Sequence, residues 1–390
     1  CPFLCGTMKS ITVKIDKAVY GGYGLGFHEG KAVLVLHGLP GDVAEIGVTE
    51  EKKDYLSGVV NKIHEPSEGR TIPSCPNFGN CGGCDYLNSS YEHELEIKKG
   101  VLLDCLRRIA KTPADSLPDI HTVSGNRLHY RSHASIKADP AGRVGFYARG
   151  TSELVPFPGQ GCSLLSEDVL DGLSVSPAAG GGDFRVAVGM DSVPRFSFGR
   201  DQMVREMEKD VLYERDIQCF FQSNHFLRSK LLRITGDYAE LAPGESFLDL
   251  GCGVGFFTLY LAGRCTGGVG VDISSRNIVW ANHNKKINNM DHVAFRNADV
   301  TTASFEDQKP EAIIVDPPRA GIAPSARKRI LSLHPERLVY ISCNPSTFAR
   351  DSLEFREGGY ELKKLTLIDM FPGTCHIEVI SQFVRSGKIL

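Results

Sequence analysis

The chain has 390 residues, a formal net charge of −3 from 44 Lys and Arg against 47 Asp and Glu, and 42% apolar residues. This length predicts two or three domains, and the near balance of charge excludes a uniformly basic nucleic-acid coat. No apolar run approaches the ~20 residues of a membrane-spanning helix, and the start of the chain has no signal-peptide pattern. We therefore expect a cytoplasmic protein without a membrane partner, whose clustered cysteines indicate metal binding or catalysis rather than a disulfide scaffold.

Short strands are predicted first, over about residues 10–67. Runs such as 11–15 and 31–35 have the composition of strands, and glycines separate them. A segment of this size predicts a small β-barrel of the oligonucleotide-binding type, with or without an RNA partner. Residues 90–111 then predict one amphipathic helix, and residues 128–200 predict a second β-rich segment.

Strands and helices alternate over the rest of the chain, from about residue 218. Apolar strands are predicted to end at Leu250, Val271, Val315 and Ile341. This alternation is typical of a parallel sheet with crossover helices, so the fold class is α/β. Residues that directly follow such strands lie in the crevice at the carboxyl edge of the sheet.

Three cysteines lie within ten residues in the sequence Cys75-x5-Cys81-Gly-Gly-Cys84. The loop around them is rich in Gly, Pro and Asn, so three thiolates can converge on one centre, either zinc or an iron–sulfur cluster. A triplet with one remote fourth cysteine is more typical of a [4Fe–4S] cluster than of zinc. Cys105 lies on the apolar face of the predicted helix, which indicates a core residue. Cys162, which follows a Gly-Gln-Gly turn, is the better fourth ligand.

A glycine-rich turn follows the strand that ends at Leu250. Its spacing is G-x-G-x-G from Gly251, which differs from the dinucleotide-binding fingerprint because Phe256 replaces the third glycine. Asp272 ends the next strand, where a carboxylate can accept hydrogen bonds from ribose hydroxyls. The segment resembles the first motif of S-adenosylmethionine-dependent methyltransferases. The alternative is a tight turn that binds no ligand.

Chemistry-bearing residues follow the later strands. Asp316-Pro-Pro comes after one strand, Cys343 after the next, and Glu378 lies near the end of the chain. This set suits methylation at C5 of a pyrimidine, because a thiolate that adds to C6 makes C5 nucleophilic and a carboxylate can then remove the C5 proton. The alternative for Cys343 alone is a passive thiol at a strand end.

Together these motifs resemble the RNA uracil-5-methyltransferase family. The most similar branch comprises 23S ribosomal RNA (uracil-5-)-methyltransferases with an N-terminal TRAM barrel and a [4Fe–4S] cluster. The motifs that carry the resemblance are Cys75-Pro-Asn-Phe-Gly-Asn-Cys81-Gly-Gly-Cys84, Asp316-Pro-Pro-Arg319-Ala-Gly321, Ser342-Cys343-Asn344-Pro345 and Phe371-Pro-Gly-Thr-Cys-His-Ile-Glu378.

The resemblance implies a role for each of these residues. Cys343 would be the nucleophile and Glu378 the general base. The implied cluster ligands are Cys75, Cys81, Cys84 and Cys162. The implied contacts to S-adenosylmethionine are Gln222, Gly251, Phe256, Asp272, Asp299 and Asp316. Phe256 departs from the family, which has Asn or Thr at that position.

The resemblance also implies three units. They are a TRAM-like barrel at 8–67, a central iron–sulfur and RNA-binding unit at 68–215, and a Rossmann-like methyltransferase domain at 216–390. Residues 91–113 would form a helix that packs on the catalytic domain. We expect a monomer that flips a uridine out of structured RNA.

The RNA partner and the reaction each have alternatives. The partner is 23S rRNA or, alternatively, the T-loop of tRNA. Lys and Arg outnumber acids between Lys98 and Arg149, so phosphate contacts are expected there. The other functions considered are amino methylation of a base or protein, suggested by Asp316-Pro-Pro, and a non-catalytic, redox-sensitive RNA-binding protein.

Overall fold

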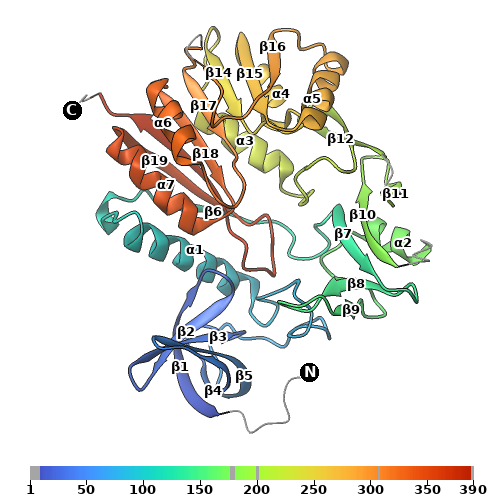
Figure 1. Cartoon of the computed structure of the whole chain (residues 1–390), viewed down its shortest axis with the longest axis vertical. Coiled ribbons are helices and arrows are strands. Elements are labelled where there is room, and N and C mark those ends of the chain that lie inside the picture. Colours follow the sequence, from blue (N-terminus) through green and yellow to red (C-terminus); the bar gives the residue numbers. More distant parts are fainter. Residues whose placement is uncertain (1–8, 176–180, 199–201, 306–307, 388–390) are drawn as a thin grey trace.

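The computed structural model describes residues 9–175, 181–198, 202–305 and 308–387. Cys1 and Cys5 lie outside the described residues, as does the start of the expected barrel segment at Met8. Figure 1 shows three parts: a barrel below, a large α/β sheet above it, and a smaller β-rich part beside the sheet.

The N-terminal segment is a closed five-stranded barrel. The strand order is β1-β2-β3-β5-β4, and β1 pairs with β4 to close it. Alternate residues of β1 point inward, and Ile11, Val13 and Ile15 pack in the barrel core. The predicted small barrel is therefore confirmed. Its strands are β1 (Ser10–Val19), β2 (Tyr23–His28), β3 (Lys31–Leu36), β4 (Val43–Glu51) and β5 (Tyr55–Glu65).

A long helix follows the cysteine loop. Helix α1 (Tyr91–Arg108) begins after Ser90, whose hydroxyl accepts a hydrogen bond from the amide of His93 at 3.2 Å. Its buried side chains, among them Leu102 and Leu106, join the hydrophobic core of the α/β part. Cys105 is buried on the same helix, as the apolar pattern predicted. Helix α1 thus packs on the α/β part, beside α7 (Pro345–Glu357).

The β-rich part contains a five-stranded sheet, and a separate hairpin lies between it and the α/β part, whose hydrophobic core includes Val211 and Tyr213 of the hairpin. The sheet order is β11-β10-β7-β8-β9, and the hairpin pairs β12 with β13. The elements of this part and of the hairpin are β7 (His133–Ala138), β8 (Val144–Tyr147), β9 (Leu154–Pro156), α2 (Glu167–Val175), β10 (Gly182–Val188), β11 (Pro194–Phe196), β12 (Met203–Glu208) and β13 (Val211–Asp216).

The α/β part contains an eight-stranded sheet in the order β16-β15-β14-β17-β18-β20-β19-β6. Strands β14 to β18 are mutually parallel where they pair, and β20 is antiparallel to β18 and to β19. The strands are β6 (Ile120–Val123), β14 (Ser246–Leu250), β15 (Gly267–Asp272), β16 (Val293–Asn297), β17 (Ala312–Val315), β18 (Arg337–Ser342), β19 (Tyr360–Ile368) and β20 (Glu378–Arg385). The remaining helices are η1 (Ala114–Ser116), α3 (Arg228–Ala239), α4 (Phe256–Ala262), α5 (Ser275–Ile287) and α6 (Pro324–Ser332).

One strand departs from the order expected along the chain. Strand β6 lies far before residue 216 in sequence, yet it pairs in parallel with β19 at the edge of the eight-stranded sheet. Its four residues are too few to show a period, so the sequence pattern gave no signal for it. No helix in the described part of the chain is both long and apolar enough to cross a bilayer.

Candidate active site

The predicted residues meet at the carboxyl edge of the sheet. Strands β14, β17 and β18 are neighbours, so Gly251, Asp316 and Cys343 follow adjacent strand ends. Gly251 has φ +88°, and a Cβ there would lie 3.0 Å from the carbonyl oxygen of Asp316, so this position requires glycine. Ser342 pairs with Val379, which places Glu378 beside Cys343. Strand pairing alone therefore assembles the predicted nucleophile and base.

Three acidic groups crowd this edge. Burial, and then the charges of Glu378 and Asp316, raise the pKa of the Cys343 thiol to about 12, whereas Arg319 lowers it. Burial raises the pKa of Glu378 well above its usual range, and Asp316 adds to this. Burial and then Asp249 raise the pKa of Asp316 to about 7. A bound cation would lower all these pKa values, because it favours the ionised forms.

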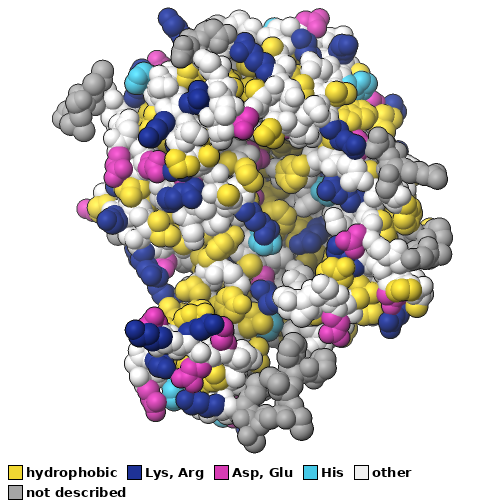
Figure 2. Space-filling model, in the orientation of Figure 1, with side chains coloured by type: hydrophobic (Ala, Val, Ile, Leu, Met, Phe, Trp, Pro, Cys, Tyr) yellow, Lys and Arg dark blue, Asp and Glu magenta, His cyan; other side chains and the backbone are white. Residues whose placement is uncertain are grey.

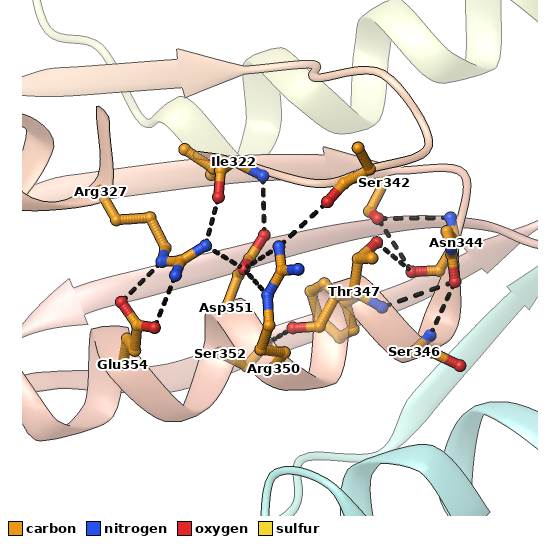
Figure 3. A network of polar contacts seen from close by, with 12 residues as sticks. Ile322, Arg327, Ser342, Asn344, Ser346, Thr347, Arg350, Asp351, Ser352 and Glu354 are labelled. Atoms are coloured by element: carbon orange, nitrogen blue, oxygen red, sulfur yellow. Dashed lines mark hydrogen bonds and ion pairs between the residues drawn. The ribbon is translucent and has the colours of Figure 1, made fainter. Parts of the chain in front are cut away.

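Buried ionic contacts hold the segment that follows the Asp-Pro-Pro-Arg loop (316–319), at Ile322 (Figure 3). The Asp351 carboxylate on α7 accepts a hydrogen bond from the amide of Ile322 at 2.9 Å, which Figure 3 shows. It accepts another from the hydroxyl of Tyr340, also at 2.9 Å. Arg327 pairs with Asp351 at 2.7 Å and with Glu354 at 2.6 Å. These contacts join α6 and α7 next to the segment that follows the loop.

The cysteine-bearing turn is tied to the same loop. Asn344 caps α7: its Oδ1 accepts a hydrogen bond from the amide of Ser346 at 3.0 Å. Its Nδ2 donates to the carbonyl oxygen of Arg319 at 3.0 Å, and the hydroxyl of Thr347 also donates there at 3.3 Å. The residue after Cys343 therefore fixes the position of the Asp-Pro-Pro-Arg loop.

The glycine turn forms the floor of a neighbouring site. The amide of Gly253 donates to Asp272 Oδ2 at 2.9 Å, and Ser274 and Asn277 donate to Oδ1 at 2.8 and 3.2 Å. A Cβ on Gly253 would meet nothing within 4 Å, so the turn borders open space. Asp299 lies on the next strand connection, since the amide of Ala298 donates to the carbonyl of Asp272 at 3.1 Å.

Two other residues predicted to contact the cofactor, Phe256 and Gln222, each also make contacts within the protein. Phe256 begins α4, and its ring packs in an aromatic cluster with Tyr213, Phe221 and Phe257. Its side chain therefore contributes to the core, consistent with the family's polar residue being absent. Gln222 is buried, and its carbonyl accepts a hydrogen bond from Arg228 at 2.6 Å.

Comparison with known proteins agrees with this geometry. Residues 187–383 match the family of tRNA (uracil-5-)-methyltransferases. The chain belongs to this family. An uncharacterized RNA methyltransferase of Aquifex aeolicus is 33% identical, covering 96% of this chain and 98% of that protein. The resemblance predicted from the motifs is confirmed, and the chain is an S-adenosylmethionine-dependent RNA (uracil-5-)-methyltransferase.

Two further relatives differ in their named substrates. The 23S rRNA (uracil(1939)-C(5))-methyltransferase of Shewanella amazonensis is 29% identical and covers 96% of this chain and 95% of that protein. The structure of Pyrococcus abyssi tRNA (uracil-54, C5)-methyltransferase, in complex with S-adenosyl-L-homocysteine, has a TM-score of 0.71. It is 24% identical and covers 95% of this chain and 100% of that one, so the two share the fold.

The loop that precedes Glu378, the predicted base, is held by α1. Lys98 is fully buried, and its ammonium contacts Glu94 at 2.8 Å, Asp369 at 2.7 Å and the carbonyl of Phe371 at 3.1 Å. Glu94 also accepts the amide of Gly373 at 2.6 Å. The expectation that Lys98 contacts RNA phosphate is therefore wrong, because its ammonium group is buried and paired with the carboxylates of Glu94 and Asp369.

Replacing Lys98 with methionine is expected to destabilise the methyltransferase strongly. The substitution leaves Glu94 and Asp369 buried without their shared cation, which costs about 3–5 kcal/mol. The free energy of unfolding measured in urea should show this loss. The neighbouring Lys99→Met is the matched control and should change stability by less than ~0.5 kcal/mol. Equal stabilities for the two variants would contradict the assignment.

Several of the other basic residues in the expected RNA-binding segment are also paired with acids. Carboxylates engage them as follows: Arg108 with Asp104, Arg127 with Glu94, Arg143 with Asp139, and Arg149 with Asp85. Such pairing weakens their pull on phosphate. Figure 2 nevertheless shows a hollow between the catalytic sheet and the β-rich part, where basic, His and hydrophobic side chains gather.

The four predicted cluster cysteines lie near one another, since a charge on one thiol raises the pKa of its neighbours. Burial raises the pKa of the Cys84 thiol, and the charges of Cys162, Cys81 and Cys75 raise it further, whereas Arg131 lowers it. All four are free thiols. Within the described ranges, no three Cys, His, Asp or Glu side chains are arranged closely enough to hold a metal. The donor set, four cysteine thiols, fits a thiolate-bound centre in its chemistry.

One residue near the site, Tyr20, had no signal in the sequence, whereas Arg319 stands in one of the motifs named above. Tyr20, at the end of barrel strand β1, approaches the carbonyl of Cys343, with 3.5 Å between the oxygens. Arg319 contacts the imidazole of His376 at 3.0 Å. Barrel periodicity cannot show that Tyr20 reaches a catalytic loop more than 300 residues away, because that contact depends on how the parts pack.

Proposed function

We propose that this enzyme methylates C5 of a uridine in structured RNA through a covalent adduct on Cys343. What supports this most is that the nucleophile and the base, Cys343 and Glu378, start from neighbouring positions on paired strands. The buried carboxylate of Glu378, with its raised pKa, is a strong base once it is ionised.

The proposed reaction has three steps. The Cys343 thiolate adds to C6 of the flipped uracil, and the electron pair of the C5–C6 double bond moves to C5 and the O4 enolate. C5 then forms a bond to the methyl carbon of S-adenosylmethionine, and the carbon–sulfur bond of the sulfonium breaks. Finally the Glu378 carboxylate takes the C5 proton, the double bond reforms, and the C6–sulfur bond breaks to return the thiolate.

The cofactor would lie along the glycine turn. S-adenosylmethionine bound there supplies the methyl group. We propose contacts from Gln222, Gly251, the backbone of Phe256, Asp272, Asp299 and Asp316. The open space at Gly253 and the crowded carboxylates fit a cationic, ribose-bearing ligand, because a sulfonium would lower their raised pKa values.

Replacing Asp272 with alanine is expected to weaken cofactor binding. Charged hydrogen bonds contribute about 1.5–3 kcal/mol, so the KM for S-adenosylmethionine should rise about 10-fold or more. Initial rates over a range of cofactor concentrations measure this change. Asp291→Ala, an exposed position just before β16, should leave the KM unchanged. An unchanged KM in Asp272→Ala would remove Asp272 from the proposed site.

The rate of methylation is expected to rise from neutral to alkaline pH. Both Cys343 and Glu378 act in their deprotonated forms, and the pKa of each is raised, so acid depletes the active forms. Single-turnover rates at saturating S-adenosylmethionine would measure this. A rate that falls as pH rises would contradict the roles of both groups.

The RNA substrate is proposed to be 23S rRNA. The relative with that named substrate matches 96% of this chain at 29% identity. The tRNA T-loop is the second candidate, since the description of the matching family names tRNA as the substrate. We propose digestion and nucleoside mapping of rRNA and tRNA after reaction with labelled S-adenosylmethionine. Labelled 5-methyluridine in 23S rRNA supports the first substrate, in tRNA the second, and a methyl group on nitrogen contradicts both.

We further propose that Cys75, Cys81, Cys84 and Cys162 bind a [4Fe–4S] cluster. The common neighbourhood of the four thiols supports this. Assays of iron, zinc and acid-labile sulfide on the purified protein test it, and zinc without sulfide would contradict it. We also propose three functional units: a TRAM-like barrel at 8–67, a central iron–sulfur and RNA-binding unit at 68–215, and a methyltransferase domain at 216–390. The protein is proposed to be a monomer, which its mass in analytical sedimentation would test.

A further inference from the structure

The loop that carries Glu378 is bonded to the cysteine loop through Asp85. The amides of Asp85 and Tyr86 both donate to the carbonyl of Gly373, at 2.8 and 3.0 Å. The Asp85 side chain returns a contact, because its Oδ2 accepts the amide of Cys375 at 2.6 Å. Asp85 is only 4% exposed, so these hydrogen bonds are shielded from water. The two loops are therefore joined by both main chain and side chain.

The opposite side of the Asp85 carboxylate is also filled. Arg149, at the turn between β8 and β9, forms an ion pair with Oδ1. The barrel turn that follows β1 packs against the same oxygen: a Cβ on Gly22, where φ is +83°, would lie 2.7 Å from it. The barrel, the β8–β9 turn and the cysteine loop thus fix the Asp85 carboxylate in one position.

The contact at Cys375 is only three residues from Glu378. The turn that holds Cys375 is braced internally from Phe371 to His376, since the hydroxyl of Thr374 accepts the amide of His376 at 3.2 Å and donates to the carbonyl of Phe371 at 2.8 Å. A braced turn moves as a unit. A displacement at Cys375 is therefore transmitted to the first residue of β20, Glu378.

We propose that Asp85 is a positioning residue for proton abstraction by Glu378. The inference rests on the proposed function, and it concerns one step of it. A general base must come within about 3 Å of the proton it removes. Addition of Cys343 to C6 and methyl transfer to C5 do not need that contact. Loss of Asp85 should therefore slow the release of methylated RNA more than its formation.

The test is a trapping experiment in single turnover. Asp85→Ala, Asp85→Asn and the wild type are mixed with RNA and methyl-labelled S-adenosylmethionine, and denaturing gels separate protein-linked from free labelled RNA. Asp85→Ala should accumulate labelled protein–RNA adduct, with release slowed about 100-fold, as a displacement of about 1 Å can cause. Asp85→Asn should be intermediate, because its Oδ1 can still accept the Cys375 amide.

Asp42→Ala is the matched control. Asp42 is equally buried and accepts two backbone amides, from Leu39 at 2.7 Å and Ser67 at 2.8 Å, as well as an arginine, Arg70. It touches the barrel rather than the base loop. Its loss should lower the melting temperature without accumulation of adduct, which separates a positioning role from general destabilisation.

Several outcomes would overturn the inference. One is release by Asp85→Ala at the wild-type rate. Another is a loss of methylation in Asp85→Ala without adduct, which would indicate a purely structural role. If Asp85→Ala does not fold, as thermal unfolding would show, Asp85→Asn decides by the same criterion. Glu378→Gln is the reference: if it traps adduct and the Asp85 variants do not, only this inference fails, whereas absence of adduct in Glu378→Gln defeats the proposed function itself.

Discussion

Cys343→Ala is expected to abolish methylation, with a loss on the order of 10⁴-fold or more. C5 of uracil is a poor nucleophile, and without a thiolate on C6 the ring has no means to place negative charge there. The variant should still fold and bind the cofactor, because Cys343 sits half-buried at the end of β18 rather than in the core. Single-turnover incorporation of labelled methyl into RNA measures the loss, and calorimetry with S-adenosylmethionine checks binding.

Cys265→Ala is the control for this prediction. Cys265 is also a half-buried free thiol, but it follows α4 and its sulfur lies 3.5 Å from the carbonyl of Leu261, away from the crevice. Its replacement should leave methylation at the wild-type rate. Methylation by Cys343→Ala at that rate would eliminate covalent catalysis by this residue.

Glu378→Gln is expected to form the methylated adduct and then stall. Glutamine keeps the size of the side chain but cannot take the C5 proton, so the bond between Cys343 and C6 cannot break. A covalent protein–RNA species that carries the labelled methyl group should therefore accumulate, while turnover falls by about 10²–10⁴-fold, the usual contribution of a general base. Denaturing gels with doubly labelled substrates detect this species directly.

The control for this prediction is Glu357→Gln, a change of the same kind at the exposed end of α7. It should turn over normally and trap nothing. If Glu378→Gln turns over at the control's rate, another group removes the proton. The crowded acids near the site would then need a different assignment, with Asp316 the first to examine.

Much of the catalytic edge could be predicted because it depends on local order. Apolar strands ending at Leu250 and Val315 predicted where Gly251 and Asp316 would lie, and the structure places them together. Parallel neighbours bring their carboxyl ends to one edge whatever the detailed packing. The barrel was predictable for a similar reason, since strand-like runs and turn glycines are local signals.

Other features required the folded chain. The four residues of β6 carry no periodic signal, and their pairing with β19 joins segments more than 200 residues apart. Lys98 looked like one more exposed cation on a basic segment. Only the packing of α1 against the sheet shows that two carboxylates and a carbonyl surround it.

The sequence by itself determined the family, the α/β class, the barrel, and the residue types available for covalent methylation, because each is written in short motifs or in periodicity. The tertiary structure alone decided which charged side chains are paired and which contacts hold the loop before Glu378. Asp85 shows the physical reason. The neighbours of its carboxylate are Gly22, Arg149 and Cys375, which are far apart in sequence. Buried polar groups must find partners, and which partners they find is settled only when distant segments pack.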